Sequence, residues 1–164
     1  MLFIHLIAGL RTGGIETYLT RVIPALDSKG HTNVVIVLKK DNVDDQILAA
    51  LDRSRTTVVR CKRPTISTLS RHLCSFAAER TGVVVINHLQ ATAIVGVLAA
   101  RRSGLKTLLI FHNTSLQAQG RFARLPFISA LRAIFVAITT PLAVRLANQR
   151  GGVSDDVRRA WFPT

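Results

Sequence analysis

The chain has 164 residues, enough for one domain of ordinary size but not for two. Hydrophobic residues make up 48% of it and charged residues only 19%, which excludes a disordered chain and predicts a sizeable core. Lysine and arginine outnumber aspartate and glutamate by 22 to 9, so the net charge is +13 and anionic partners are favoured.

The positive charge dominates the second half, because no acidic residue occurs between Glu79 and Asp155. This bias fits an anionic partner, and it fits general solubility or a compositional bias of the genome equally well. Cys61 and Cys74 are too few for a disulfide framework or a zinc site, and we expect both to be reduced core residues. The first residues lack the basic segment and cleavage site of a signal peptide, which predicts a cytoplasmic location.

The first forty residues predict a βαβ unit. Residues 2–8 are a short apolar run that Gly9 ends, which is typical of a strand buried on both faces. Apolar residues then recur at helical spacing over residues 16–28, and Gly30 follows as a helix stop. Residues 34–38 read as a second buried strand, so one strand, one helix and one strand succeed one another.

The same alternation continues as far as residue 111. Helices are predicted over residues 44–51, 66–80 and 92–102, and strands over residues 56–60, 83–86 and 106–111. Gly82 and Gly104 follow two of these helices as stops. The alternation predicts an α/β fold, a Rossmann-like parallel sheet with helices on both faces and right-handed crossovers.

The alternation of predicted strands and helices is less regular after His112. Residues 113–120 are polar and predict a loop. Near the end, residues 151–158 predict a short strand or turn followed by a helix N-terminus. Ser154 is the expected cap of that helix, and the two aspartates after it suit the helix dipole.

A mainly apolar stretch covers residues 122–147, and Pro126 and Pro141 should interrupt it. Its arginines make it a poor membrane span. Two interpretations remain open, a core helix of the fold and a basic, amphipathic surface segment that touches anionic lipid.

A glycine-rich turn, Gly9-Leu10-Arg11-Thr12-Gly13-Gly14-Ile15-Glu16, joins the first strand to the first helix. Glycines let the backbone approach a ligand closely and a helix N-terminus presents N–H groups, so the turn suits an anion. It matches neither a P-loop, which needs Lys and then Ser or Thr after Gly14, nor a dinucleotide fingerprint, which needs glycine in place of Arg11. A plain glycine-rich turn without a ligand stays an alternative.

Two histidines follow predicted strands, His88 after residues 83–86 and His112 after residues 106–111. Because ligands of open parallel sheets bind outside the carboxyl ends of the strands, we expect both histidines and the glycine turn to converge there. Imidazoles hydrogen-bond sugar hydroxyls or phosphate oxygens and titrate near neutral pH. A lone histidine at a strand end is more often an ordinary polar residue, so the prediction depends on the convergence.

Five short segments occur in this order along the chain: Gly13-Gly14-Ile15-Glu16, Gly30-His31-Thr32-Asn33-Val34, the strand end at His88, Phe111-His112-Asn113-Thr114, and Val153-Ser154-Asp155-Asp156-Val157-Arg158. Together they resemble the N-terminal domain of the family 4 glycosyltransferases of the GT-B fold. The resemblance implies the N-terminal half of a GT-B architecture. It also implies retaining transfer of a hexose from a nucleotide-sugar to a lipid-linked or polysaccharide acceptor.

The resemblance implies roles for the residues that match. His112 is the expected catalytic residue, in contact with the acceptor or the transferred sugar near the reaction centre. Binding of substrate or diphosphate is expected of Gly13, Gly14, Glu16, His88, Asn113 and Thr114, and Glu16 would also help to cap the first helix. Enzymes of this type have no obvious protein nucleophile, and neither a metal nor a cofactor is expected.

The donor-binding half of the family pattern, with its basic pair and E-x7-E element, does not occur before Thr164. We therefore expect residues 1–164 to be a single acceptor-side domain without transfer activity of its own. The expected partners are a nucleotide-sugar donor held by the absent domain, a glycolipid or saccharide acceptor, and the anionic inner face of the membrane as a peripheral contact.

A function of a different class is a non-catalytic βα module that binds anions or nucleic acid through the basic half of the chain. The sequence has one Trp, one Tyr and seven Phe for base stacking and contains no RNA-binding motif. No nucleic-acid partner is therefore expected.

Overall fold

The computed structural model describes residues 1–10, 13–38, 43–52, 54, 56–78, 80–88, 93–112, 126–154 and 157. These residues form a six-stranded, parallel sheet with the order β3-β2-β1-β4-β5-β6. The strands are β1 (Leu2–Ile7), β2 (Thr32–Val37), β3 (Thr57–Arg60), β4 (Val83–Asn87), β5 (Lys106–Phe111) and β6 (Gln149–Gly152). The chain runs outward from β1 to β3 and then returns to the other side of β1, so the strand order reverses between β1 and β4.

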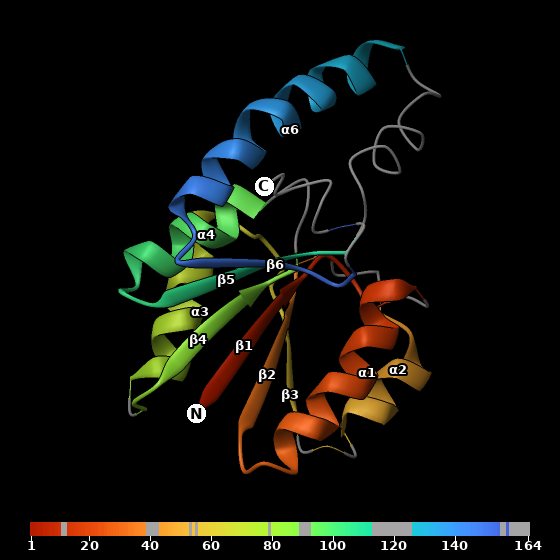
Figure 1. Cartoon of the computed structure of the whole chain (residues 1–164), viewed down its shortest axis with the longest axis vertical. Helices are drawn as coiled ribbons and strands as arrows, with labels where there is room; N and C mark the ends of the chain where they lie inside the picture. Colours follow the sequence, from red (N-terminus) through yellow and green to blue (C-terminus); the bar gives the residue numbers. More distant parts are fainter. Residues whose placement is uncertain are drawn as a thin grey trace.

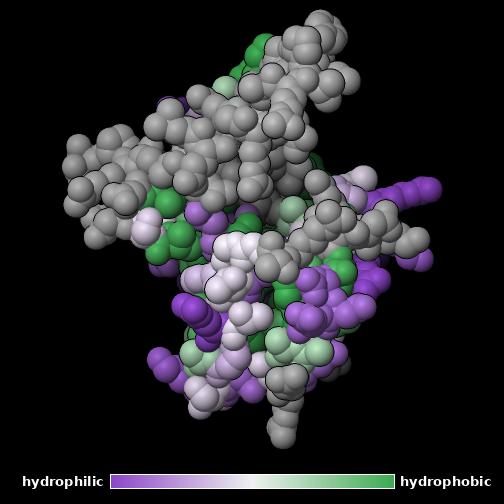
Figure 2. Space-filling model, turned by 90° about the vertical axis from the view of Figure 1, so that its right-hand side faces the viewer, coloured by the Kyte–Doolittle hydropathy of each residue, from purple (hydrophilic) through white to green (hydrophobic). Residues whose placement is uncertain are grey.

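Helices cover both faces of this sheet (Figure 1). Helices α1 (Gly14–Asp27) and α2 (Asp45–Asp52) lie on one face, and α3 (Ile66–Ala77), α4 (Ala93–Arg102) and α6 (Pro126–Leu146) lie on the other. The predicted fold class, a Rossmann-like parallel sheet with helices on both faces, is confirmed. Figure 2 looks onto the side of α1 and α2, whose outward surface is largely hydrophilic.

The elements predicted up to residue 111 are all present, with ends that differ by a few residues. The helix predicted over residues 66–80 ends at Ala77, and the strand predicted over residues 83–86 extends to Asn87. The three predicted glycine stops have positive φ angles, 76° at Gly30, 73° at Gly82 and 68° at Gly104. Glycine adopts this left-handed conformation at little cost, which suits Gly30 and Gly104 to the turns after α1 and α4, whereas Gly82 lies immediately before β4 and not at the end of α3.

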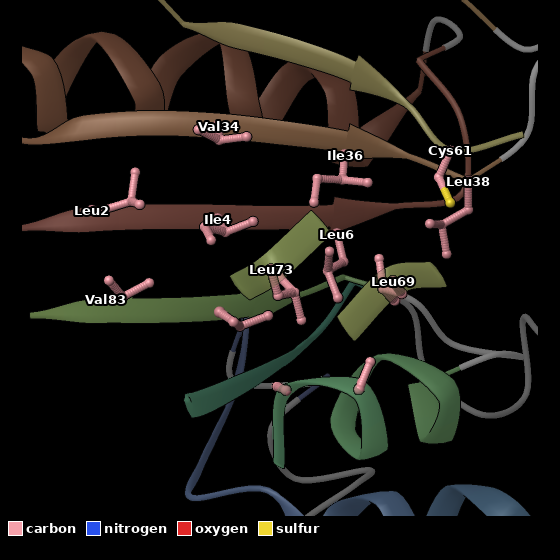
Figure 3. Packing of buried hydrophobic residues seen from close by; sticks show 13 residues of the cluster. Leu2, Ile4, Leu6, Val34, Ile36, Leu38, Cys61, Leu69, Leu73 and Val83 are labelled. Atoms are coloured by element: carbon pink, nitrogen blue, oxygen red, sulfur yellow. The ribbon is translucent and has the colours of Figure 1, made fainter. Parts of the chain in front are cut away.

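An apolar cluster fills the space between the sheet and helices α3 and α4 (Figure 3). Its buried members are Leu2, Ile4, Leu6, Val34, Ile36, Leu38, Cys61, Leu69, Leu73, Val83, Val85, Ala99 and Ala100. Strand side chains alternate between faces, so Phe3, His5 and Ile7 of β1 point to the opposite face, under α1 and α2. The same strands therefore serve two different interiors.

The two cysteines differ in burial. Cys61 lies in the apolar cluster, as expected, but Cys74 is exposed, so the prediction of a core position for it was wrong. Cys74 directly follows the buried Leu73 on α3, and one residue turns a helix by about 100°, which carries its side chain away from the core.

The apolar stretch contains one helix, α6, and the prediction that Pro141 interrupts it was wrong, while residues 122–125 before Pro126 lie outside the described residues. Pro126 is the first residue of α6, where a missing N–H costs nothing, and Pro141 lies inside the helix. An internal proline costs about 3 kcal/mol in an isolated helix. Here the flanking turns are held by packing of α6 on α4 and by a hydrogen bond of 3.2 Å from Arg101 Nη1 to the Leu146 carbonyl.

Helix α6 has two unlike sides. Thr140 and Ala143 are buried where it packs on the domain, whereas Ile134, Phe135, Ile138 and Leu142 are 47–66% exposed. It is therefore not a core helix on all sides. Within the described part of the chain, no helix has both the length and the apolar character needed to cross a bilayer.

Candidate functional site

The carboxyl ends of β1, β4 and β5 meet near the start of α1 (Figure 1). This is the point where the strand order reverses, with β1 leading to one half of the sheet and β4 to the other. Neighbouring connections diverge at such a reversal and leave room for a ligand between them. The sequence predicts that the glycine turn, His88 and His112 lie together at this end of the sheet.

Gly13 and Gly14 form the start of α1. Gly13 is the N-cap residue in an extended conformation, φ −177° and ψ −177°, and its carbonyl accepts the first helical hydrogen bond, from the Thr17 N–H, at 3.0 Å. A Cβ atom added to Gly14 would meet nothing within 4 Å. Among the described residues, nothing in the fold therefore demands glycine at position 14. Glu16 lies in the first turn of α1, where its charge suits the helix dipole.

The two predicted histidines do come together. His88 follows β4, its backbone N–H donates to the Leu6 carbonyl at 3.0 Å, and its Nδ1 lies 2.7 Å from Nε2 of His112, which follows β5. The convergence predicted for the histidines is thus confirmed. His112 is partly exposed, whereas His88 is only 3% exposed, so His88 lies behind His112 as seen from solvent.

Three further members of the site, His5, Asn33 and Tyr18, were not predicted from the sequence. His5 of β1 is fully buried, its Nδ1 lies 3.2 Å from Nε2 of His88, and its Nε2 lies 3.3 Å from Oδ1 of Asn33 in β2. Tyr18 of α1 packs its ring against His112, with a centroid distance of 5.2 Å, and against His88, at 5.8 Å. The available signal was a histidine inside an otherwise apolar strand, a buried polar residue that needs a partner.

Burial controls the protonation of all three imidazoles. It lowers the pKa of His5 from 6.5 to about 4, although the hydrogen bond with Asn33 acts in the opposite direction. It also lowers the pKa of His112 to about 4. The pKa of His88 falls well below 6.5, first through burial and then through repulsion from His5 and His112. At neutral pH the three rings are therefore uncharged.

The three imidazoles stand in series and do not surround a common point. Accordingly, the described residues contain no group of three His, Cys, Asp or Glu side chains that could hold a metal ion. What neutral rings in series offer is hydrogen bonding, with one N–H and one lone pair on each.

The remaining predicted residues fall into two groups. Asn113 and Thr114, like the predicted loop over residues 113–120, lie outside the described residues. Ser154 behaves as predicted, since its Oγ accepts a hydrogen bond from the Val157 N–H at 3.3 Å, directly after the strand β6.

Comparison with known proteins gives one result. The model of a family described as glycosyl transferase 4-like domain matches residues 13–159. The matched range contains Tyr18, Asn33, His88 and His112, whereas His5 lies before it. The comparison with curated proteins found no match.

Proposed function

Since the chain belongs to the glycosyl transferase 4-like domain family, we propose that it is the acceptor-side domain of a retaining glycosyltransferase. In this proposal the enzyme transfers a hexose from a nucleotide-sugar to a lipid-linked or polysaccharide acceptor. A separate donor-binding domain binds the nucleotide of the nucleotide-sugar. The domain described by residues 1–164 supplies the acceptor side of the reaction centre.

The observation that carries the proposal is the contact of 2.7 Å between His88 and His112 at the reversal of strand order. His112 is the partly exposed member, so it is the imidazole that contacts the acceptor or the transferred sugar. His88 is buried and both of its ring nitrogens contact other imidazoles, which favours a positioning role over direct binding. Asn113 and Thr114 complete the binding side in the proposal.

The start of α1 is the proposed contact for the donor diphosphate or the acceptor. None of the described residues would contact a Cβ atom at Gly14 within 4 Å, so in the proposal a ligand reaches the backbone N–H groups of the first turn at this position. Glu16 lies in that same turn, where it contributes to the shape and charge of the site.

The decisive experiment replaces His112 by alanine in an enzyme that joins this domain to a donor-binding domain. Loss of a hydrogen-bonding group at the reaction centre should lower turnover about 100-fold or more. The matched control is His72→Ala on α3, away from the site, which should leave turnover unchanged. Equal turnover for the His112 variant and the wild type, with both folded by circular dichroism, would contradict the proposal.

A peripheral membrane contact through α6 is a second part of the proposal. Ile134, Ile138 and Leu142 recur four residues apart, so they form an exposed apolar stripe along one side of the helix. Arg145 lies two turns after Ile138 and is exposed on the same side. An apolar stripe that ends in a cation suits the surface of an anionic membrane.

Vesicle flotation tests this membrane contact. The chain should float with vesicles that contain phosphatidylglycerol and remain in solution with phosphatidylcholine alone. Replacing both Ile134 and Ile138 by serine should abolish flotation, whereas Val153→Ser, at an exposed apolar residue outside α6, should not. Identical behaviour of the two variants would remove α6 from the proposal.

A further inference from the structure

Four side chains form a continuous series from the interior to the surface. Asn33 Oδ1 lies 3.3 Å from His5 Nε2, His5 Nδ1 lies 3.2 Å from His88 Nε2, and His88 Nδ1 lies 2.7 Å from His112 Nε2. The first three residues are at most 3% exposed, and only His112 reaches solvent. We refer to these four residues as the imidazole series.

A series of neutral imidazoles has a direction. Each neutral ring carries one N–H and one lone pair, and each contact between two rings requires one of each. If the proton position on one ring is fixed, the positions on the other rings follow. Only two arrangements satisfy every contact, and they are opposite in direction.

The amide of Asn33 selects one of these two arrangements. Its Oδ1 faces His5 and only accepts, so Nε2 of His5 carries the proton and donates to it. Nδ1 of His5 then accepts from Nε2–H of His88, and Nδ1 of His88 accepts from Nε2–H of His112. The nitrogen of His112 outside the series, Nδ1, is left with a lone pair.

We propose that Asn33, His5 and His88 are positioning residues that fix the tautomer of His112, so that its Nδ1 is a hydrogen-bond acceptor. An acceptor nitrogen binds a hydroxyl group and has no proton to donate to a phosphate oxygen. If His112 contacts substrate, as the proposed function states, its partner is therefore a hydroxyl of the sugar or the acceptor. The direction of the series itself does not depend on that function.

The opposite arrangement would give the opposite chemistry. If Nδ2 of Asn33 faced His5 instead, each proton would move to the other nitrogen of its ring, and Nδ1–H of His112 would be a donor suited to phosphate. The tautomer of His112 thus distinguishes a hydroxyl partner from a phosphate partner, and it is measurable without any ligand.

The test is a long-range ¹H–¹⁵N correlation spectrum of the chain labelled at histidine, recorded near pH 7.5. We expect His5, His88 and His112 to carry the proton on Nε2. The bias at His112 should be about tenfold or more, because, with Oδ1 of Asn33 facing His5, reversal would set two hydrogen-bond acceptors against each other. His31 and His72, outside the series, serve as internal references for the same chain. A proton on Nδ1 of His112, or an even mixture, would overturn the proposal.

Two substitutions test the role of Asn33. Asn33→Asp keeps an acceptor oxygen and should retain the wild-type tautomers, whereas Asn33→Leu removes the acceptor and should reduce the bias at His112 several-fold. If Asn33→Leu does not fold, His5→Phe interrupts the series with a ring of similar size and should have the same effect on His112. An unchanged tautomer in the folded variant would show that Asn33 and His5 do not act on His112.

The spectra also separate this inference from the proposed function. If the tautomers are as expected but His112→Ala leaves sugar transfer unchanged, the series stands and the catalytic assignment fails. If transfer is lost but Nδ1 of His112 carries the proton, the catalytic assignment stands and the directional series fails.

Discussion

The two faces of the sheet are made by alternate residues of the same strands, yet their interiors differ in chemistry. Under α3 and α4, Leu2, Ile4 and Leu6 of β1 join a cluster that contains apolar side chains throughout. Under α1 and α2, the same strand contributes His5 to a polar series that continues to His88 and His112. The first face buries apolar area. The second face buries side chains that also form a series of hydrogen bonds with a fixed order of donors and acceptors.

This division matters because buried polar groups cost free energy unless they are paired. The apolar face tolerates variation in detail as long as its volume is filled. The imidazole series under α1 and α2 is stable only if each of its side chains is hydrogen-bonded to the next. We therefore expect substitutions in the apolar cluster to lower stability at every pH, and substitutions in the imidazole series to change proton positions and the pH dependence of stability.

The largest effect on stability should come from the apolar face. Leu73→Ala removes a fully buried side chain and leaves a cavity, which should lower the free energy of unfolding by about 2–5 kcal/mol. Ile138→Ala, at a side chain 66% exposed on α6, should change it by less than about 0.5 kcal/mol. Urea titrations of both variants measure the difference, and equal losses would contradict the assignment of the core.

The polar face should make stability depend on pH. Because the pKa of His5 is 6.5 when unfolded and about 4 when folded, neither state is protonated above pH 6.5, and only the unfolded state gains a proton between pH 6.5 and 4. Stability should fall over this window, by about 3 kcal/mol from His5 alone. His88 and His112 add to the fall in the same direction, since their pKa values are also lowered.

His5→Phe should remove the contribution of His5 to this fall, while Ile138→Ala, at an exposed side chain that does not titrate, should leave it unchanged. The polar and aromatic contacts of the imidazoles from neighbouring elements are the hydrogen bond of Asn33 with His5 and the ring contacts of Tyr18 with His88 and His112. A stability of the wild type that is constant from pH 7 to 4.5 would mean that the rings are not buried in the neutral form.

Most of the fold followed from the sequence because its signals are local. Apolar runs of strand length, helical spacing and glycines after three of the helices are properties of neighbouring residues, and they predicted every element up to residue 111. Pro141 was misjudged because its tolerance depends on packing of α6 against α4, a contact between distant segments.

The site was only partly predictable for the same reason. His88 and His112 were found because each follows a strand, and the carboxyl ends of parallel strands lie together. His5 and Asn33 are inside strands, where no local pattern separates a functional side chain from a buried polar residue. Their contact depends on the parallel register of β1 and β2, which pairs Phe3 with Asn33 and His5 with Val35.

Tyr18 packs against the imidazoles from α1, with ring contacts to His88 and His112. Tyr18→Leu should lower the free energy of unfolding by about 0.5–1.5 kcal/mol through loss of the ring contacts with His88 and His112. Tyr18→Phe keeps the ring and should preserve stability. If thermal unfolding shows the same loss for both variants, the hydroxyl of Tyr18 and not its ring holds this side of the site.

The smallest effect on stability, and the clearest separation of folding from binding, is expected at Gly14. A methyl group at this position meets no described residue within 4 Å, so Gly14→Ala should change the free energy of unfolding by less than about 1 kcal/mol, in the stabilising direction. Gly30→Ala is the matched control, because its φ of 76° is strained for alanine and should cost about 1 kcal/mol.

Ligand binding should distinguish the two glycine variants in the opposite way to stability, because it should be weakened by Gly14→Ala and not by Gly30→Ala. Titration with inorganic pyrophosphate, followed through the amide signals of residues 13–16, should show weaker binding for Gly14→Ala, since the methyl group stands where a ligand approaches the first turn of α1. Gly30→Ala should bind as the wild type does. Equal pyrophosphate binding by Gly14→Ala and the wild type, or no response of the wild type, would show that the start of α1 is a plain turn. His112 alone would then remain as the proposed ligand contact.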